Sequence, residues 1–208
     1  MDNLTRKIIG VLICVFILSI AYYGTYLPLK KSRSFIEAMK SMRYAKSVDD
    51  FKSIASVPLD IPSPIGQEEL VRNIANAALN LVQRTDDTAI INAVMDFIEE
   101  RYRPVIDRGR GMSFEQNLYI LGAMNETAFV KTKEKKYFDA AKIYYSMGLE
   151  LGPKRPQFLY GMFDIYRLEG NVDGAKGIAE RILSQWPNDA RIGEGLNDFL
   201  AKILTKNQ

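Results

Sequence analysis

Small residues and prolines recur at one fixed distance in the C-terminal half of the chain. Ala141 and Ala175 are 175 − 141 = 34 residues apart, and Pro153 and Pro187 are 187 − 153 = 34 residues apart. A small side chain lets two antiparallel helices approach closely, and a proline ends the second helix because it has no backbone N–H to donate. A repeat of this length indicates stacked helix hairpins that bury their apolar faces against one another. The sequence therefore predicts a helical-repeat scaffold.

The composition favours an all-α chain and argues against most catalytic centres. Of the 208 residues, 47% are hydrophobic and 25% are charged, as in ordinary globular proteins. The sequence has no histidine, which removes most zinc sites, the Ser-His-Asp triad and the commonest general base. The net charge of +3 is too small to favour nucleic acid as a partner. We therefore expect no enzymatic activity, no cofactor and no metal.

An apolar run near the N-terminus predicts a membrane anchor behind a short tail, residues 1–7. Residues 8–27 carry no charged side chain and provide about the 20 residues that a helix needs to cross a bilayer. Tyr22, Tyr23 and Tyr26 stand near the end of the run, where an aromatic belt is expected. A single-pass transmembrane helix over residues 8–27 is the interpretation that we favour.

A cleaved signal peptide is the alternative to an anchor. Ser19-Ile20-Ala21 has the small-x-small pattern of a signal-peptidase site and follows the basic residues Arg6 and Lys7. The apolar run continues past this site to Leu27, which favours an uncleaved anchor.

The orientation of the anchor stays open at the level of sequence. The basic residues after the run are Lys30, Lys31, Arg33, Lys40 and Arg43. By the positive-inside rule they would keep the following domain in the cytoplasm, whereas large folded domains can cross a membrane despite such charges.

Residues 28–66 are expected to form juxtamembrane helices and a proline-rich bend. Apolar residues at three- and four-residue steps predict an amphipathic helix over 32–45, and Ser47-Val48-Asp49-Asp50 begins a shorter one. Three prolines between Pro58 and Pro64, followed by Gly66, predict a segment without regular helix.

Residues 67–208 are expected to form the helical repeat domain. Apolar stripes predict a helix over 67–83 and another after Asp86-Asp87, which Pro104 should kink or end. Ser113 is expected to cap the following helix in a capping box with Gln116.

Two parts of this repeat domain, the turn before Ala141 and the C-terminal end, depart from a regular unit. Gly122 lies 141 − 122 = 19 residues before Ala141, where a standard unit has about 12, so the turn over 131–136 is expected to carry an insertion. From Asp189 onward a last amphipathic helix should cap the domain with a polar outer face.

The two C-terminal units resemble tetratricopeptide repeats. The matching residues are Ala141, Tyr145 and Pro153 in the first unit and Ala175 and Pro187 in the second. The second unit departs from the pattern at Ala179, where a bulky residue is expected. The resemblance implies an α-solenoid of antiparallel helix hairpins whose first helices line a groove for a protein or peptide.

This resemblance also places the partner-binding surface, because first-helix residues not used for packing face the groove. The expected partner-binding residues are Gln116, Tyr119, Glu126, Gln157, Tyr160, Asp164 and Arg167. Tyr119 and Tyr160 fall on the same repeat position and offer two aromatic anchors with polar tips, which suit a peptide with apolar and charged groups. The alternative is that both tyrosines only pack against the neighbouring helix.

A wider resemblance covers most of residues 26–204. The segments Tyr26-Leu27-Pro28-Leu29, Ile65-Gly66-Gln67-Glu68-Glu69 and Pro153-Lys154-Arg155-Pro156-Gln157 are similar to the C-terminal tail of O-antigen ligase-like polymerases of the bacterial envelope. This chain has one span where those enzymes have many, and it lacks the loop that carries their catalytic arginines and histidine. The resemblance implies the cell envelope and glycan-assembly machinery as the setting, without transferase activity.

The leading hypothesis is a membrane-tethered scaffold with an extracytoplasmic repeat domain that binds a protein or peptide in envelope or surface-polysaccharide assembly. One alternative is a non-catalytic accessory subunit of a polysaccharide polymerase or ligase. The other is a docking receptor that faces the cytoplasm, which the lysines after the anchor would favour.

Overall fold

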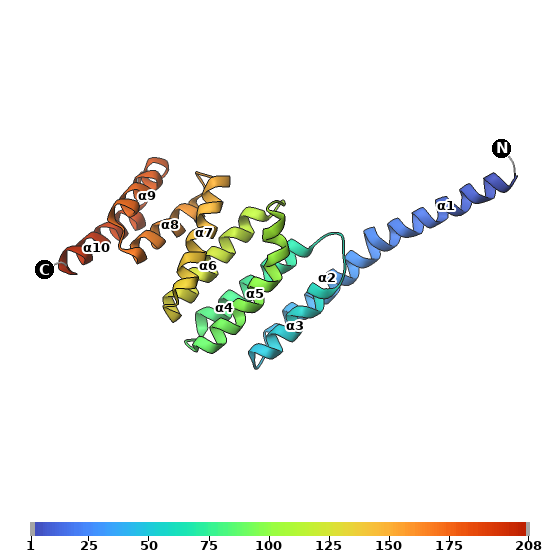
Figure 1. Ribbon diagram of the computed structural model, residues 1–208, viewed down its shortest axis with the longest axis horizontal. Helices are drawn as coiled ribbons and strands as arrows, with labels where there is room; N and C mark the ends of the chain where they lie inside the picture. Colours follow the sequence, from blue (N-terminus) through green and yellow to red (C-terminus); the bar gives the residue numbers. More distant parts are fainter. Residues whose placement is uncertain (1–2, 207–208) are drawn as a thin grey trace.

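The computed structural model describes residues 3–206, and every regular element in that range is a helix, as the sequence predicts (Figure 1). Helix α1 (Asn3–Ala21), a π-helical turn (Tyr22–Tyr26) and α2 (Leu27–Met42) follow one another without a break. The remaining helices are α3 (Val48–Asp60), α4 (Gln67–Arg84), α5 (Thr88–Arg108), α6 (Phe114–Thr132), α7 (Lys135–Leu151), α8 (Pro156–Glu169), α9 (Val172–Gln185) and α10 (Ala190–Lys206).

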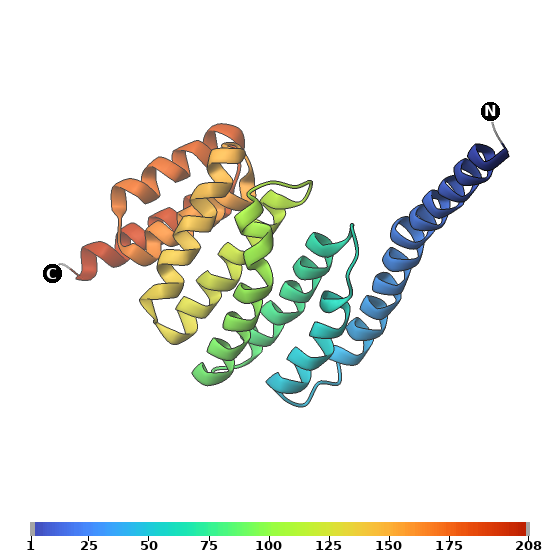
Figure 2. The ribbon, with the colours of Figure 1, turned by 45° about the vertical axis from the view of Figure 1, so that its right-hand side comes forward.

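Consecutive helices pack in pairs, and the pairs follow one another along the long axis of the molecule (Figures 1 and 2). Helix α2 contacts α3, α4 contacts α5, α6 contacts α7, and α8 contacts α9. Contacts between α4 and α6 and between α6 and α8 join neighbouring pairs. A single apolar core of buried residues extends through these pairs from Phe51 in α3 to Phe199 in α10.

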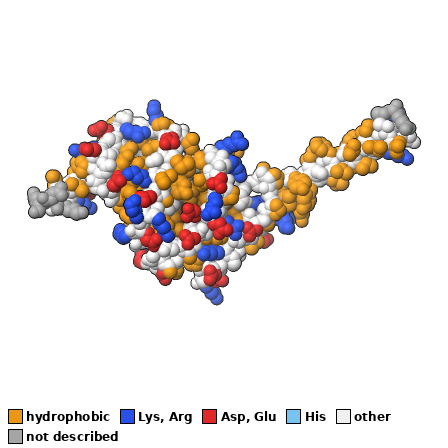
Figure 3. Space-filling model, in the orientation of Figure 1, with side chains coloured by type: hydrophobic (Ala, Val, Ile, Leu, Met, Phe, Trp, Pro, Cys, Tyr) orange, Lys and Arg blue, Asp and Glu red, His pale blue; other side chains and the backbone are white. Residues whose placement is uncertain are grey.

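Helix α1 extends away from the packed helices and has no buried residue (Figures 1 and 3). The continuous helix Asn3–Met42 is 40 residues long and contains a stretch that is apolar and long enough to cross a membrane. In Figure 3 hydrophobic side chains cover this part of the molecule. By length and composition α1 could span a membrane, and an N-terminal signal sequence has the same two properties.

Pro28 does not separate the apolar helix from the juxtamembrane helix. The helical path widens to a π-turn just before Pro28, where the Leu27 N–H bonds the Tyr22 carbonyl five residues back. Proline has no N–H and crowds the carbonyl four residues earlier, and a local π-turn relieves that crowding without ending the helix. The helix that the sequence predicts over 32–45 is therefore not separate: it ends at Met42 as the C-terminal part of the continuous helix Asn3–Met42, which we call the rod.

Two other prolines also lie inside helices. Pro58 is buried in the last turn of α3, so the bend that the sequence predicts from Pro58 begins only after Asp60 and ends at Gly66. Pro104 lies inside α5, which continues to Arg108. Pro104 and Glu100 are both exposed, so water can bind the Glu100 carbonyl that loses its intrahelical donor.

Lys31 is a buried charged residue that ties the rod to this bend. Its side chain is 3% exposed, and its Nζ donates a 2.8 Å hydrogen bond to the Ile61 carbonyl and another to the Gln67 side chain. The ammonium group thereby connects α2 to the start of α4 across the bend.

The turn between α6 and α7 does not carry the insertion that the sequence predicts. Helix α6 ends at Thr132 and α7 begins at Lys135, so only two residues connect them. The extra residues lengthen the helices instead, since α6 has 19 residues and α7 has 17, against 14 each for α8 and α9. Lys133 takes the left-handed conformation, with φ 61°, that closes the end of α6.

The small residues of the 34-residue period are fully buried. Ala141 in α7 and Ala175 in α9 are both 0% exposed, as a position between packed helices requires. Tyr145 and Ile182 are buried nearby in the same two helices. Each of these helices thus turns its repeated small residue toward the core.

Candidate functional site

Five of the seven expected partner-binding residues line one cavity between α6, α8 and the start of α10. The cavity has a volume of about 660 Å³. The five residues are Tyr119, Glu126, Gln157, Tyr160 and Asp164. We call this cavity the α6–α8 groove.

Helical periodicity explains why these residues share the groove. On α8, Gln157, Tyr160 and Asp164 are three and four residues apart, which places their side chains on one face of the helix. Leu159 and Phe163 face the core instead and are buried. The α8 helix therefore separates a polar groove face from an apolar packing face.

Tyr145 of α7 lies at the floor of the groove, and the sequence indicates it only as a packing residue. Its ring lies between Gly122 of α6 and Gly161 of α8, where a Cβ atom would come within 3.0 Å of the ring at either glycine. Its hydroxyl donates a 2.7 Å hydrogen bond to Oε2 of Glu126. The two glycines give the ring room to reach the groove between two hairpins.

Glu126 and Asp164 are half-buried carboxyl groups in the wall of the groove. Burial raises the pKa of Glu126 to about 7, while the Tyr145 hydrogen bond opposes this shift and the nearby Asp164 adds to it. Burial also raises the pKa of Asp164, against the lowering effect of Arg167 and Arg191. A cationic group entering the groove would stabilise the ionised forms of both carboxyl groups.

Tyr160 belongs to a polar cluster that the helix periodicity alone does not indicate. Its hydroxyl donates a hydrogen bond to Asp189, and the guanidinium carbon of Arg191 lies 4.4 Å from the centre of its ring. The hydrogen bond to Asp189 raises the pKa of the Tyr160 hydroxyl and lowers that of the Asp189 carboxyl. Trp186 stacks with the same ring at a centroid distance of 6.4 Å.

Tyr119 is the more available of the two expected aromatic anchors. It is 40% exposed, and its ring meets that of Phe158 edge to face at a centroid distance of 6.3 Å. Tyr160 is committed to Asp189, Arg191 and Trp186 by contacts within the protein. Both tyrosines therefore contact neighbouring helices, and Tyr119 keeps the larger exposed surface.

Gln116 and Arg167 are not among the residues that line the groove. The Gln116 side chain accepts a hydrogen bond from Arg72 of α4, and Ser113 forms no capping hydrogen bond, so the expected capping box is absent. Arg167 forms a 3.0 Å ion pair with Asp164 and lies 5.4 Å from the ring centre of Phe163. Arg167 therefore acts on the groove through Asp164.

Two arginines of α5, Arg101 and Arg108, form ion pairs with other helices. Arg101 of α5 pairs with Asp60 of α3 at 2.6 Å and also donates to Ser56. Arg108 pairs with Glu68 of α4 at 2.9 Å. In the described range 3–206, His, Cys, Asp and Glu residues form no group of three or more that could hold a metal ion.

Searches of protein-family models, curated proteins and solved structures find no match to this chain. The resemblances to tetratricopeptide repeats and to envelope polymerases therefore rest on the residues of this sequence alone. The functional argument that follows is built on the geometry of the groove.

Proposed function

We propose that this protein is a membrane-tethered, tetratricopeptide-like scaffold that binds a segment of a partner protein in the α6–α8 groove. The observation that carries the proposal is the groove itself, where aromatic and carboxyl side chains from separate hairpins surround a cavity of about 660 Å³. A concave site with a few convergent polar groups is the usual form of a binding site.

The arrangement of hairpins supports the solenoid part of this proposal. The connections within the pairs α6–α7 and α8–α9 are Lys133–Glu134 and Gly170–Asn171, so the paired helices run antiparallel. Contacts of α4 with α6 and of α6 with α8 bring the first helices of successive pairs together. Stacked units of this kind offer an extended surface formed by the same helix of each unit.

The charge of the groove favours a partner segment with a basic side chain beside apolar ones. Glu126, Asp164 and Asp189 line the groove, and among the described residues Arg191 is the only basic one in the lining. Tyr119 adds an exposed aromatic surface next to these carboxyl groups. A lysine or arginine of the partner would pair with Glu126 and Asp164, while its apolar neighbours would pack on Tyr119.

The apolar rod supplies the tether in this proposal. Helix α1 is exposed along its length and lies apart from the helices that form the groove (Figure 2). Insertion of α1 into a bilayer would hold the groove near the membrane surface. The resemblance to envelope polymerases supports an extracytoplasmic domain in surface-polysaccharide assembly, as a scaffold or a non-catalytic accessory subunit.

Peptide binding to the full-length protein in detergent micelles tests the groove. The probe is a labelled peptide of alternating lysine and leucine, and the variants are Asp164→Asn and Tyr119→Ala. The matched control is Glu150→Gln, which removes an exposed carboxylate of α7 outside the groove. We expect each groove variant to weaken binding about tenfold, with no change for the control. Equal affinities for all four proteins, each with unchanged helicity, would rule out this groove.

Protease access to the C-terminus in intact spheroplasts tests the location separately. Digestion from outside supports the extracytoplasmic domain, and protection supports the cytoplasmic docking receptor. This experiment does not depend on what the groove binds.

A further inference from the structure

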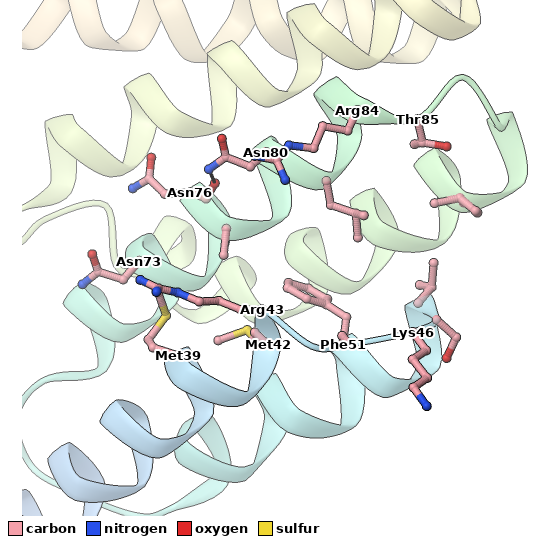
Figure 4. Close-up of a pocket in the computed structure, with 16 residues that line it drawn as sticks. Met39, Met42, Arg43, Lys46, Phe51, Asn73, Asn76, Asn80, Arg84 and Thr85 are labelled. Carbon is pink, nitrogen blue, oxygen red and sulfur yellow. Dashed lines mark hydrogen bonds between the residues drawn. The ribbon is translucent and has the colours of Figure 1, made fainter.

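A second cavity of about 680 Å³ lies between the α2–α3 pair and the α4–α5 pair (Figure 4). It shares no lining residue with the α6–α8 groove. We call it the α2–α4 groove. Any function of this cavity is therefore independent of the proposed binding in the α6–α8 groove.

Apolar side chains form much of the surface of the α2–α4 groove. Met39 and Met42 of α2 are half-buried, and Phe51 of α3 is buried with 4% exposure. Ala77 and Leu81 of α4 add to the apolar part. Methionine side chains are flexible and adapt to partner side chains of different shape.

Three asparagines of α4 line the same groove at successive turns of the helix (Figure 4). Asn73, Asn76 and Asn80 each donate one amide hydrogen to the backbone carbonyl four residues earlier, at 2.8, 3.1 and 2.9 Å. Within residues 3–206 these side chains make no other hydrogen bond. Each amide thus keeps its oxygen and its second hydrogen for a ligand.

One step between the asparagines is close to the repeat of an extended peptide, and the other is shorter. Along the axis of α4 they are about 4.5 Å and 6 Å apart. Alternate residues of an extended chain are about 6.6 Å apart and present backbone N–H and C=O groups in the same direction. Side-chain amides at this spacing can bond the backbone of an extended segment while its side chains reach the apolar surface.

The charges of the groove are all basic. Arg43, Lys46 and Arg84 line it and are exposed, and no aspartate or glutamate among residues 3–206 is part of the lining. Ion pairs of the described residues involve none of these three side chains. An acidic ligand would therefore meet three cations that are not already neutralised.

We propose that the α2–α4 groove binds an extended, acidic segment of a partner protein, with apolar side chains packed on Met39, Met42 and Phe51. The three cations select carboxylates in the segment, and the asparagines hold its backbone. The two grooves of the chain then select segments of opposite charge, basic in the α6–α8 groove and acidic in the α2–α4 groove.

The test measures fluorescence anisotropy with full-length protein in detergent micelles. The probe is a labelled peptide of alternating glutamate and leucine, about six residues long, since Asn73 and Thr85 are roughly 18 Å apart along α4. The variant is the double charge reversal Arg43→Glu with Arg84→Glu. The matched control is Arg103→Glu with Lys176→Glu, which changes the net charge equally at exposed positions outside the groove.

We expect the groove variant to bind the acidic peptide roughly tenfold more weakly, and the control variant to bind it as the unmodified protein does. Methylation of alternate backbone nitrogens in the peptide should also weaken binding, because it removes N–H groups that would donate hydrogen bonds to the asparagine side-chain oxygens. A peptide of alternating lysine and leucine should not bind in this groove.

Several results would overturn the proposal. One is equal affinity of the groove variant, the control and the unmodified protein when all three have the same helicity. Another is an equal loss of affinity in the control variant, because it would show that binding depends on the net charge of the protein and not on this groove. A third is binding of vesicles with anionic phosphatidylglycerol, lost in the groove variant, without any binding of the acidic peptide.

Discussion

The Tyr145 hydroxyl donates a 2.7 Å hydrogen bond to the Glu126 carboxyl group, and this contact joins the hairpin core to the wall of the α6–α8 groove. The Tyr145 ring passes between Gly122 and Gly161, which belong to different hairpins. One side chain of α7 thus fixes both the spacing of α6 and α8 and the position of a groove carboxyl group.

The substitution Gly161→Ala should destabilise the fold. Its Cβ would come to 2.5 Å from Cζ of the Tyr145 ring, so the ring or α8 must shift, at a cost of about 1–3 kcal/mol. Gly177→Ala in α9 is the control, since a Cβ there meets nothing within 4 Å and alanine favours helix by about 0.5–1 kcal/mol. Urea unfolding followed by circular dichroism compares the two variants. A Gly161→Ala protein as stable as Gly177→Ala would contradict the packing of Tyr145 between the glycines.

Stability should fall with rising pH because of Glu126. The folded pKa is about 7 and the ordinary value is 4.5, so the folded state holds this proton more tightly than the unfolded state. The contribution is fully present below pH 4.5 and is lost as the pH rises through about 7. Glu126→Gln keeps an acceptor for Tyr145 and carries no charge, so it removes this dependence.

Urea unfolding at two pH values measures the effect of Glu126. We expect Glu126→Gln to equal the unmodified protein near pH 4.5 and to be more stable at pH 8. The expected difference at pH 8 is about 1–2 kcal/mol, because partial contact with water reduces the cost of the buried charge. If the two proteins differ in free energy of unfolding by the same amount at both pH values, the substitution acts through packing and not through the charge of Glu126.

The sequence predicts the helix faces well because they depend on local periodicity. Gln157, Tyr160 and Asp164 share a face by their spacing, and the structure places all three in one cavity. The same period predicts Tyr119 and Glu126 of α6, which also line the cavity. Gln116 does not line it and instead bonds Arg72 of the neighbouring hairpin. That bond depends on how α4 and α6 pack, which the spacing along one helix does not specify.

Contacts between hairpins account for the other differences from the sequence prediction. Asp189 and Arg191 enter the site from the start of α10, far in sequence from α6, and Tyr145 enters through space left by two glycines. The glycines Gly122 and Gly161 were the available signal, because helical glycines often mark close approach. Of the two outcomes expected at Pro104, an end of the helix is excluded, because α5 continues to Arg108 around the exposed proline. A π-turn likewise lets the helix continue through Pro28.

Membrane insertion of α1 has a direct biochemical test. If residues 8–27 span a bilayer, the protein should stay in the membrane fraction during alkaline carbonate extraction and keep its full mass. The physical reason is that α1 is apolar and has no buried residue, so extraction would expose its whole surface to water. A soluble product that begins at Tyr22 would instead show cleavage after Ser19-Ile20-Ala21.

Lys31 should control how firmly the rod is attached to the repeat helices. Its Nζ bonds the Ile61 carbonyl at 2.8 Å, so Lys31→Met fills the same space but leaves that carbonyl without its donor. We expect a loss of about 1–3 kcal/mol and faster amide hydrogen exchange over residues 61–67, where the bend meets α4. Lys30→Met is the matched control, since Lys30 is exposed on the same helix. Faster exchange spread evenly over α4 to α10 would show a general loss of stability, and unchanged exchange at the bend would show that Lys31 does not hold it.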